Sequence, residues 1–398
     1  MTERLAIIGT GMAGARLAES LIAEGYRGQI TMLGEERDKP YNRIQLSTVL
    51  AGDKPIDGLP LLSDDWYRAH DITLHGGDPV VHLDGHNRTL RTASGWQSSF
   101  DRIVIATGSR PFIPPIPGTS LPGVMAFRTL DDIAVMHSFA EAGGAAIVIG
   151  GGLLGLEAAY GLNQLGLDVT VVHNSTTLMN RQLDPRAARM LQESLEGRGI
   201  RIVTGARTSA VTGEERATGI ELDDGRRLAG RLVVFATGIS PNVEVFHNSG
   251  LAVERGIQVD DQMATNLPGI YALGECAEHN GVTVGIVAPI WDQATVLTET
   301  LLGRTASYQP REHSTQLKVS GIDVFSAGNL AADTDSRDIV LSDPNAGIYR
   351  RLVIRDNRLQ AALLFGDKRL CSDYETLIAN GTPLGDHEQQ LMFCPPPS

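Results

Sequence analysis

Cysteine is scarce in this sequence, and that scarcity excludes several kinds of site. The 398 residues include three cysteines, Cys276, Cys371 and Cys394. No two of them have the C-x-x-C spacing typical of zinc and redox motifs, and three thiols cannot complete a four-cysteine zinc or iron–sulfur centre. The sequence therefore predicts no metal site, and so few thiols fit a reducing compartment.

The sequence also lacks long apolar runs and an excess of positive charge. No apolar run reaches the roughly 20 residues that a membrane-spanning helix needs. The first residues, "MTERLAIIG", enter an expected strand at once, so we expect no signal peptide. Asp and Glu outnumber Lys and Arg by 47 to 34, for a formal net charge of −13. We therefore expect a cytoplasmic protein that binds neither nucleic acid nor a membrane.

Glycine, by contrast, is abundant, with 44 residues, and it forms the same motif twice. In "AIIGTGMAGARLAES" (6–20) and "IVIGGGLLGLEAAY" (147–160) an apolar strand turns into a helix over G-x-G-x-x-G. The first glycine permits the tight turn, the second lets a pyrophosphate approach the backbone, and the third lets the helix pack on the strand. These glycines are Gly9, Gly11 and Gly14 in the first motif and Gly150, Gly152 and Gly155 in the second.

The repeat extends beyond these two motifs. A strand follows each helix, at 29–34 and 168–173, and each block later has a strand ending in Ala-Thr-Gly, at Thr107-Gly108 and again at Gly238. This order indicates a duplicated nucleotide-binding domain, so two nucleotide cofactors are expected. We predict an α/β fold with two Rossmann-like domains, at 1–113 with 243–306 and at 114–242. A small α+β domain is expected at 307–398, with a turn at Asp356-Asn357 and a helix at 372–381.

The residues after the second strand of each domain bear on ribose recognition. In the first domain we choose Glu35 as the acid for the ribose hydroxyls. In the second domain the strand ends in His173-Asn174, so no acid is there to bind NAD or to repel NADP, and the choice between NADH and NADPH stays open. His173 could contact a phosphate, although we favour an exposed residue at the strand end. Glu157 lies two residues after the third glycine and is included in the second site.

The string "GIYALGECAE" (269–278) places Gly274 and Glu275 directly after another expected strand. An acid at that position can bond a ribityl hydroxyl of a flavin. The next helix begins near Ala288–Trp291, with Pro289 in its first turn, and its positive end could face the pyrimidine edge of a reduced flavin. We expect Cys276 to be a core packing residue and not a reactive thiol.

Together these motifs resemble the pyridine nucleotide–disulfide oxidoreductase family, which has a glutathione-reductase-like fold. The resemblance implies FAD at the first fingerprint, with Glu35 and Glu275, and NAD(P)H at the second. Disulfide reductases of this family carry a redox cysteine early in the FAD domain, whereas residues 1–275 contain no cysteine. A role like that of glutathione reductase is therefore not expected.

Within the family, several strings resemble the flavoprotein region of NAD(P)H-dependent nitrite reductases. They are "KPYNRIQLSTVLAG" (39–52), "TLMNRQLD" (177–184), "GECAEHNGVTVGIVAP" (274–289), "LKVSGIDVFSAG" (317–328) and "LLFGD" (363–367). Such reductases often have a basic residue near the flavin where Arg43 falls, so we expect Arg43 to touch the isoalloxazine or the cofactor phosphates. Unlike the full nitrite reductases, this sequence has no iron–sulfur or sirohaem segments.

The resemblance implies an FAD-dependent NAD(P)H oxidoreductase that gives electrons to a separate iron–sulfur, rubredoxin-like or sirohaem protein, in nitrite or nitrate reduction. Hydride transfer to a flavin requires no acid or base from the protein, so Arg43 is the only candidate at the catalytic centre. The alternatives are a rubredoxin or ferredoxin reductase, a reductase of quinones, nitric oxide or peroxide, and a non-enzymatic flavin-binding assembly or sensor. Family members often pair through the C-terminal domain, so a homodimer also fits.

Overall fold

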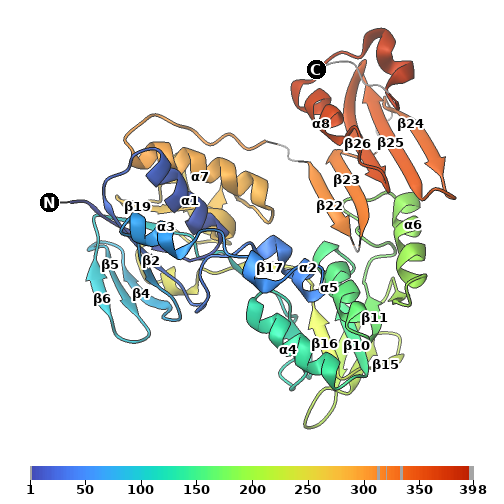
Figure 1. The fold of residues 1–398 in the computed structure, drawn as a ribbon, viewed down its shortest axis with the longest axis horizontal. Coiled ribbons are helices and arrows are strands. Elements are labelled where there is room, and N and C mark those ends of the chain that lie inside the picture. The colour runs from blue at the N-terminus through green and yellow to red at the C-terminus, as the bar shows by residue number, and fades with distance from the viewer. Residues whose placement is uncertain (1, 312–313, 320, 332–334, 394–398) are drawn as a thin grey trace. The chain divides into compact units, whose positions relative to one another are not determined.

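A five-stranded parallel sheet lies at the centre of the first half of the structure (Figure 1). The strand order is β19 (Ile270–Ala272), β7 (Arg102–Ile105), β1 (Arg4–Ile8), β2 (Gln29–Leu33) and β3 (Thr73–His75). Apolar runs such as "LAII" are buried on both faces of this sheet, as parallel strands require. Helices α1 (Met12–Ala23) and α7 (Val287–Leu301) pack side by side (Figure 1).

The structure is a computed structural model that describes residues 2–311, 314–319, 321–331 and 335–393. It divides into two compact units. The first unit comprises Met1–Leu46, Pro55–Pro111 and Gly238–Arg311, and the second comprises Ser47–Lys54, Phe112–Thr237 and Glu312–Ser398. Cys394 and the proline-rich end lie outside the described residues. Within the described residues, no helix is both long and apolar enough to cross a membrane.

Smaller elements complete the first unit. Its strands form two three-stranded groups and one pair, and its helices are short. They are β4 (Val80–Asp84), β5 (Thr89–Thr92), β6 (Gln97–Ser99), β18 (Ile257–Val259), β20 (Ala277–His279), β21 (Val282–Thr283), β8 (Ser109–Pro111), β17 (Ile239–Pro241) and α3 (Asp64–Ala69). Single 3₁₀ turns lie at Arg43–Gln45, Ile56–Gly58, Glu244–Phe246 and Gly274–Cys276.

The second unit repeats the parallel design. Its strand order is β12 (Arg201–Val203), β11 (Asp168–Val172), β10 (Ala145–Ile149), β16 (Leu232–Phe235) and β9 (Val124–Ala126), all parallel. Its helices are α2 (Leu46–Leu50), α4 (Leu130–Glu141), α5 (Leu153–Gln164) and α6 (Pro185–Glu196), and β13 (Thr208–Thr212), β14 (Gly219–Leu222) and β15 (Arg227–Ala229) form a small antiparallel sheet. In both units the strand before the glycine motif is the middle strand, which confirms the predicted α/β duplication.

The C-terminal part of the second unit is an antiparallel sheet, as expected. Its order is β22 (Thr315–Val319), β23 (Ile322–Gly328), β26 (Arg358–Phe365), β25 (Ile348–Arg355) and β24 (Arg337–Asp343). Helix α8 (Cys371–Asn380) covers one face of this sheet (Figure 1). The predicted turn joins β25 to β26, where Asp356 and Asn357 both have positive φ, 51° and 56°. Consecutive residues with positive φ are the signature of a tight hairpin turn.

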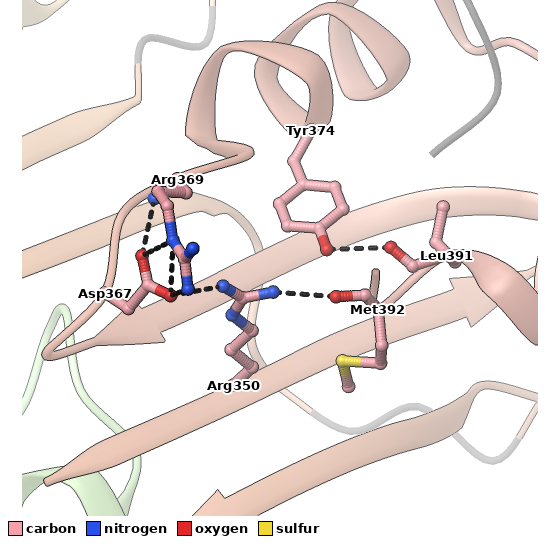
Figure 2. Close-up of polar contacts among 6 residues, drawn as sticks. All are labelled: Arg350, Asp367, Arg369, Tyr374, Leu391 and Met392. Atoms are coloured by element: carbon pink, nitrogen blue, oxygen red, sulfur yellow. Dashed lines mark hydrogen bonds and ion pairs between the residues drawn. The ribbon is translucent and has the colours of Figure 1, made fainter. Parts of the chain in front are cut away.

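A buried polar network holds Leu391 and Met392, which follow the 3₁₀ turn Gly385–Gln390, on this sheet (Figure 2). The Arg350 side chain is 8% exposed and donates to Asp367 Oδ2 at 2.8 Å and to the Met392 carbonyl at 2.7 Å. Tyr374 Oη donates to the Leu391 carbonyl at 2.8 Å. Arg369 also bonds Asp367, so this carboxylate accepts from two guanidinium groups. The network fixes residues 391–392 against the apolar core that lies between α8 and the sheet.

Candidate functional site

The first glycine motif forms a cradle between β1 and α1. Gly9 has φ +125°, and a Cβ there would lie 2.1 Å from the Ala106 carbonyl oxygen. A Cβ on Gly14 would lie 2.3 Å from the Gly9 oxygen. Gly11 differs, because no atom lies within 4 Å of where its Cβ would stand. Gly9 and Gly14 are therefore required by the chain itself, and Gly11 leaves open space at the start of α1.

The second motif repeats this arrangement between β10 and α5. Gly150 has φ +129°, and a Cβ there would meet the Ala236 oxygen at 2.2 Å, while a Cβ on Gly155 would meet the Gly150 oxygen at 2.0 Å. Gly152 again has nothing within 4 Å. Neither helix has a side-chain cap at its first residue, so its leading N–H groups can bind an anion such as a pyrophosphate. Both cradles fit a dinucleotide.

Residues after β2 form a cluster beside the first cradle. Gly34 lies against Thr10 of the cradle, and Glu35, the predicted ribose acid, follows it with an exposed side chain. The cluster itself centres on Glu36. Its carboxylate accepts from Tyr41 Oη at 2.6 Å and from Arg43 Nη2 at 2.5 Å.

Arg43 is thus held in place by its neighbours. Its guanidinium lies 4.9 Å from the centroid of the Tyr41 ring, and its side chain keeps 21% of its surface exposed. The contribution of Glu36 and Tyr41 was not foreseen from the sequence, because nothing in the string distinguishes Glu36 from Glu35 as a partner.

The first Ala-Thr-Gly segment is bound to the chain after β17. Thr107 Oγ1 donates to the Asn242 carbonyl at 2.8 Å, and the Asn242 side chain donates back to the Thr107 carbonyl at 3.0 Å. The Asn242 N–H also donates to the Gly108 carbonyl at 2.9 Å, where Gly108 has φ +65°. These bonds set the position of Ser109, which donates to Glu275 Oε2 at 2.7 Å.

Gly274 and Glu275 are brought to the first cradle. A Cβ on Gly274 would lie 3.2 Å from Cβ of Ala13 in α1, so the two segments are in contact. The Gly274 N–H donates to Oε1 of Gln293, a buried residue of α7 that the sequence analysis missed, at 2.8 Å. Pro289 is buried in the first turn of α7. The first unit therefore gathers Gly9, Gly11, Gly14, Glu275 and the start of α7.

Cys276 is a packing residue, as the sequence analysis favoured. It is fully buried, and its Sγ donates to the carbonyls of Leu273 and Ile105. Burial raises the pKa of the thiol, so it stays protonated. Among the described residues, no three His, Cys, Asp or Glu side chains are grouped to hold a metal ion.

Glu157 faces α2 in the second unit. Burial raises the pKa of this carboxyl to about 7, although a hydrogen bond with Ser47 opposes the shift.

The remaining predicted glycine, Gly238, has φ +119° and open space at its Cβ position.

His173 corrects an expectation. We favoured an exposed residue at the strand end, but the ring is half-buried and its Nδ1 accepts from the Gly151 N–H at 3.1 Å. A Cβ on Gly151 would lie 2.7 Å from Cγ of His173, so the ring packs directly on the glycine turn. The position looked exposed because a sequence does not show which turn folds back over a strand end.

A comparison with known protein families matches the part of the chain that contains both cradles. The family described as pyridine nucleotide-disulphide oxidoreductase matches residues 3–297. The rubredoxin NAD+ reductase C-terminal domain matches residues 314–382, the part that forms the antiparallel sheet.

Individual proteins within this family are also similar to the chain. The chain is 44% identical to a nitrite reductase [NAD(P)H] and 42% identical to an assimilatory nitrate reductase electron transfer subunit, both of Bacillus subtilis, over 92% of its length in each case. It spans about half of those relatives, 46% and 48% respectively. A crystal structure of the ferredoxin reductase for the CYP199A2 system of Rhodopseudomonas palustris matches with a TM-score of 0.83 at 29% identity, covering 92% of this chain and 91% of that one.

Proposed function

Because the chain belongs to the pyridine nucleotide-disulphide oxidoreductase family, we propose that it takes electrons from NAD(P)H and passes them to a separate protein in nitrite or nitrate reduction. It is an FAD- and NAD(P)H-dependent oxidoreductase, as the family assignment shows. The identity of the electron acceptor and the nitrogen compound reduced are the proposed part.

The two cradles suit the two cofactors. Gly11 and Gly152 leave room for a pyrophosphate, and the uncapped N–H groups of α1 and α5 can bind it. We assign FAD to the first cradle, with Glu275 on its ribityl chain, Glu35 on its ribose and Arg43 at the flavin or phosphates. Bound FAD supplies a group that accepts hydride and can return electrons singly.

The proposal of a separate electron acceptor depends on the absence of a redox-active cysteine from residues 1–275. Residues 1–275 contain no cysteine, and Cys276 is buried as a protonated thiol. Electrons therefore do not leave through a redox cysteine early in the FAD domain, the route of the family's disulfide reductases, and we propose that an external acceptor takes them from the cofactor. The relatives named as an electron transfer subunit and a ferredoxin reductase support a protein acceptor. We propose an iron–sulfur, rubredoxin-like or sirohaem protein, and a cytoplasmic location because reduced nicotinamide nucleotides are kept there.

The test is anaerobic reduction followed by transfer. NADH or NADPH should bleach the flavin absorbance band of the purified protein rapidly. An iron–sulfur or sirohaem partner should then restore the band faster than quinone or peroxide does. The Gly152→Val variant should resist NAD(P)H but still be bleached by dithionite. Slow bleaching by both coenzymes would instead favour a sensor, and equal reoxidation by quinone would favour a small-molecule reductase.

A further inference from the structure

The nicotinamide nucleotide is left unspecified by the proposed function, and the following inference rests on that function. In nucleotide folds of this kind, an acid after the second strand binds the ribose 2′-hydroxyl of NAD, and a nearby Arg accommodates the 2′-phosphate of NADP. Residues 173–183, "HNSTTLMNRQL", follow β11 and contain no acid. The next acid, Asp184, is engaged elsewhere. It caps α6 through the Arg186 and Ala187 N–H groups and accepts from Tyr349 Oη at 2.6 Å.

His173 is the first residue after β11, in the stretch that lacks an acid, and it can act as a hydrogen-bond donor. Because Nδ1 accepts from the Gly151 N–H, the proton of a neutral ring lies on Nε2. Burial lowers the pKa of His173, with the Asn180 side chain opposing the shift, so the neutral form is favoured. Nε2 is itself buried and has no hydrogen-bond partner within 3.5 Å among the described residues. A donor at this position attracts a phosphate oxygen, whereas a carboxylate would repel it.

Two guanidinium groups extend from the segments that border His173. The Ala206 N–H donates to the His173 carbonyl at 3.0 Å, and Arg207 is the next residue. The Met179 N–H donates to the Gly151 carbonyl at 2.9 Å, and Arg181 lies two residues on. Both arginine side chains are exposed, and neither forms an ion pair in the part of the chain that the structure describes. They bring positive charge to the segments that border His173.

We infer that the second cradle admits the 2′-phosphate of NADPH and that the chain uses NADPH at least as efficiently as NADH. His173 contributes an uncharged donor in place of a repelling acid, and Arg181 and Arg207 contribute the positive charge that a phosphate dianion requires. The specificity follows as much from the absent repulsion as from the new attraction.

Binding of nucleotide fragments tests this without turnover. In calorimetric titrations of the FAD-loaded protein, 2′,5′-ADP should bind at least as tightly as 5′-ADP. The His173→Glu variant should weaken 2′,5′-ADP about tenfold or more and leave 5′-ADP within about threefold, since it places like charges together. Arg207→Gln and Arg181→Gln should each weaken 2′,5′-ADP several-fold. The matched control is Arg226→Gln, an exposed arginine of the same unit that is paired with Asp224.

The outcomes separate this inference from the proposed function. If the wild-type protein binds 2′,5′-ADP ten times more weakly than 5′-ADP, the inference is overturned whatever the variants do. If NADH bleaches the flavin and NADPH is a hundredfold less efficient, the inference also fails while the proposed function stands. If neither coenzyme bleaches it, the proposed function itself is lost. Should His173→Glu prove unstable, the comparison of 2′,5′-ADP with 5′-ADP on the wild-type protein still tests whether the second cradle admits the 2′-phosphate.

Discussion

Ser109 donates a hydrogen bond to Glu275 across 2.7 Å and so joins two segments that are 166 positions apart in the chain. Ser109 is buried and follows the first Ala-Thr-Gly segment, and Glu275 follows β19. A carboxylate that accepts from a buried hydroxyl loses rotamer freedom, so its remaining acceptor sites have a fixed direction. Ser109 is in this way a positioning residue for the proposed ribityl contact.

Removing the Ser109 hydroxyl should weaken FAD binding. A hydrogen bond to a charged group contributes about 1.5–3 kcal/mol, and because this one lies within the protein only part of it affects binding, so Ser109→Ala should raise the FAD dissociation constant by up to about tenfold. Ser109→Thr should retain most of the affinity. Titration of apoprotein by flavin fluorescence quenching measures both.

The control for this substitution is Ser94→Ala. Ser94 Oγ also donates to a carboxylate, Asp78 Oδ2 at 2.7 Å, within the same unit but on an exposed turn. It should leave the FAD dissociation constant unchanged. An equal loss of affinity in both alanine variants, or none in Ser109→Ala, would contradict the positioning role.

The glycines of the first cradle should separate into two classes. Gly14→Ala should lower the yield and melting temperature of the apoprotein, because its Cβ would lie 2.3 Å from a backbone oxygen. Gly11→Ala should leave that melting temperature within about 2 °C, since its backbone suits alanine and its Cβ meets nothing, yet it should weaken FAD binding. Thermal melts of apoprotein and flavin titrations measure the two effects. If Gly11→Ala bound FAD normally, the open space would not be the pyrophosphate position.

Much of this architecture could be predicted from the sequence because its signals are local. Four of the six motif glycines, the parallel strands and the turn at Asp356-Asn357 each depend on a short string with fixed backbone needs. The contacts that finish the site could not be predicted in this way. Ser109 with Glu275 and Gly274 with Gln293 join distant segments, and both depend on side-chain rotamers that only the folded chain sets.

The choice between neighbouring residues was also beyond the sequence. Glu35 and Glu36 are adjacent acids, yet only the packing of Tyr41 and Arg43 shows which of them those side chains contact. The role of Glu35 at the ribose stays a prediction. His173 was misjudged for the same reason, since its burial comes from the glycine turn and not from its own strand.

Breaking the Arg350–Asp367 pair should destabilise the C-terminal sheet. Asp367→Asn leaves the buried guanidinium without its counter-charge, a change that typically costs about 3–5 kcal/mol. The Arg369 and Arg350 guanidinium groups hold the pKa of Asp367 well below its usual value. Its stabilisation is therefore complete above the ordinary pKa near 3.8 and is lost as the pH falls through the lowered value.

Urea unfolding of Asp367→Asn at pH 7 and at pH 3 measures this effect. The variant should unfold at a lower urea concentration than the wild type at pH 7, and the difference should shrink in acid. Asp356→Asn is the control, because Asp356 is 87% exposed at a turn where asparagine is equally suited. A difference that stayed constant with pH would show that the charge of Asp367 is not its cause.

Glu157 should make the second unit less stable as the pH rises. Its pKa is raised from 4.5 to about 7, so the folded state favours the protonated carboxyl. Stability is full below about pH 4.5 and falls as the pH rises towards and through 7, by an amount that reaches about 3 kcal/mol for a shift of this size. Glu157→Gln keeps a neutral side chain of similar shape, so it should stabilise the protein at pH 8 and have little effect at pH 4.5. Denaturant unfolding at both pH values measures the difference.

Glu193→Gln, at an exposed position on α6, should change stability at neither pH. If Glu157→Gln had the same effect at pH 4.5 as at pH 8, the carboxyl would not be titrating near neutrality.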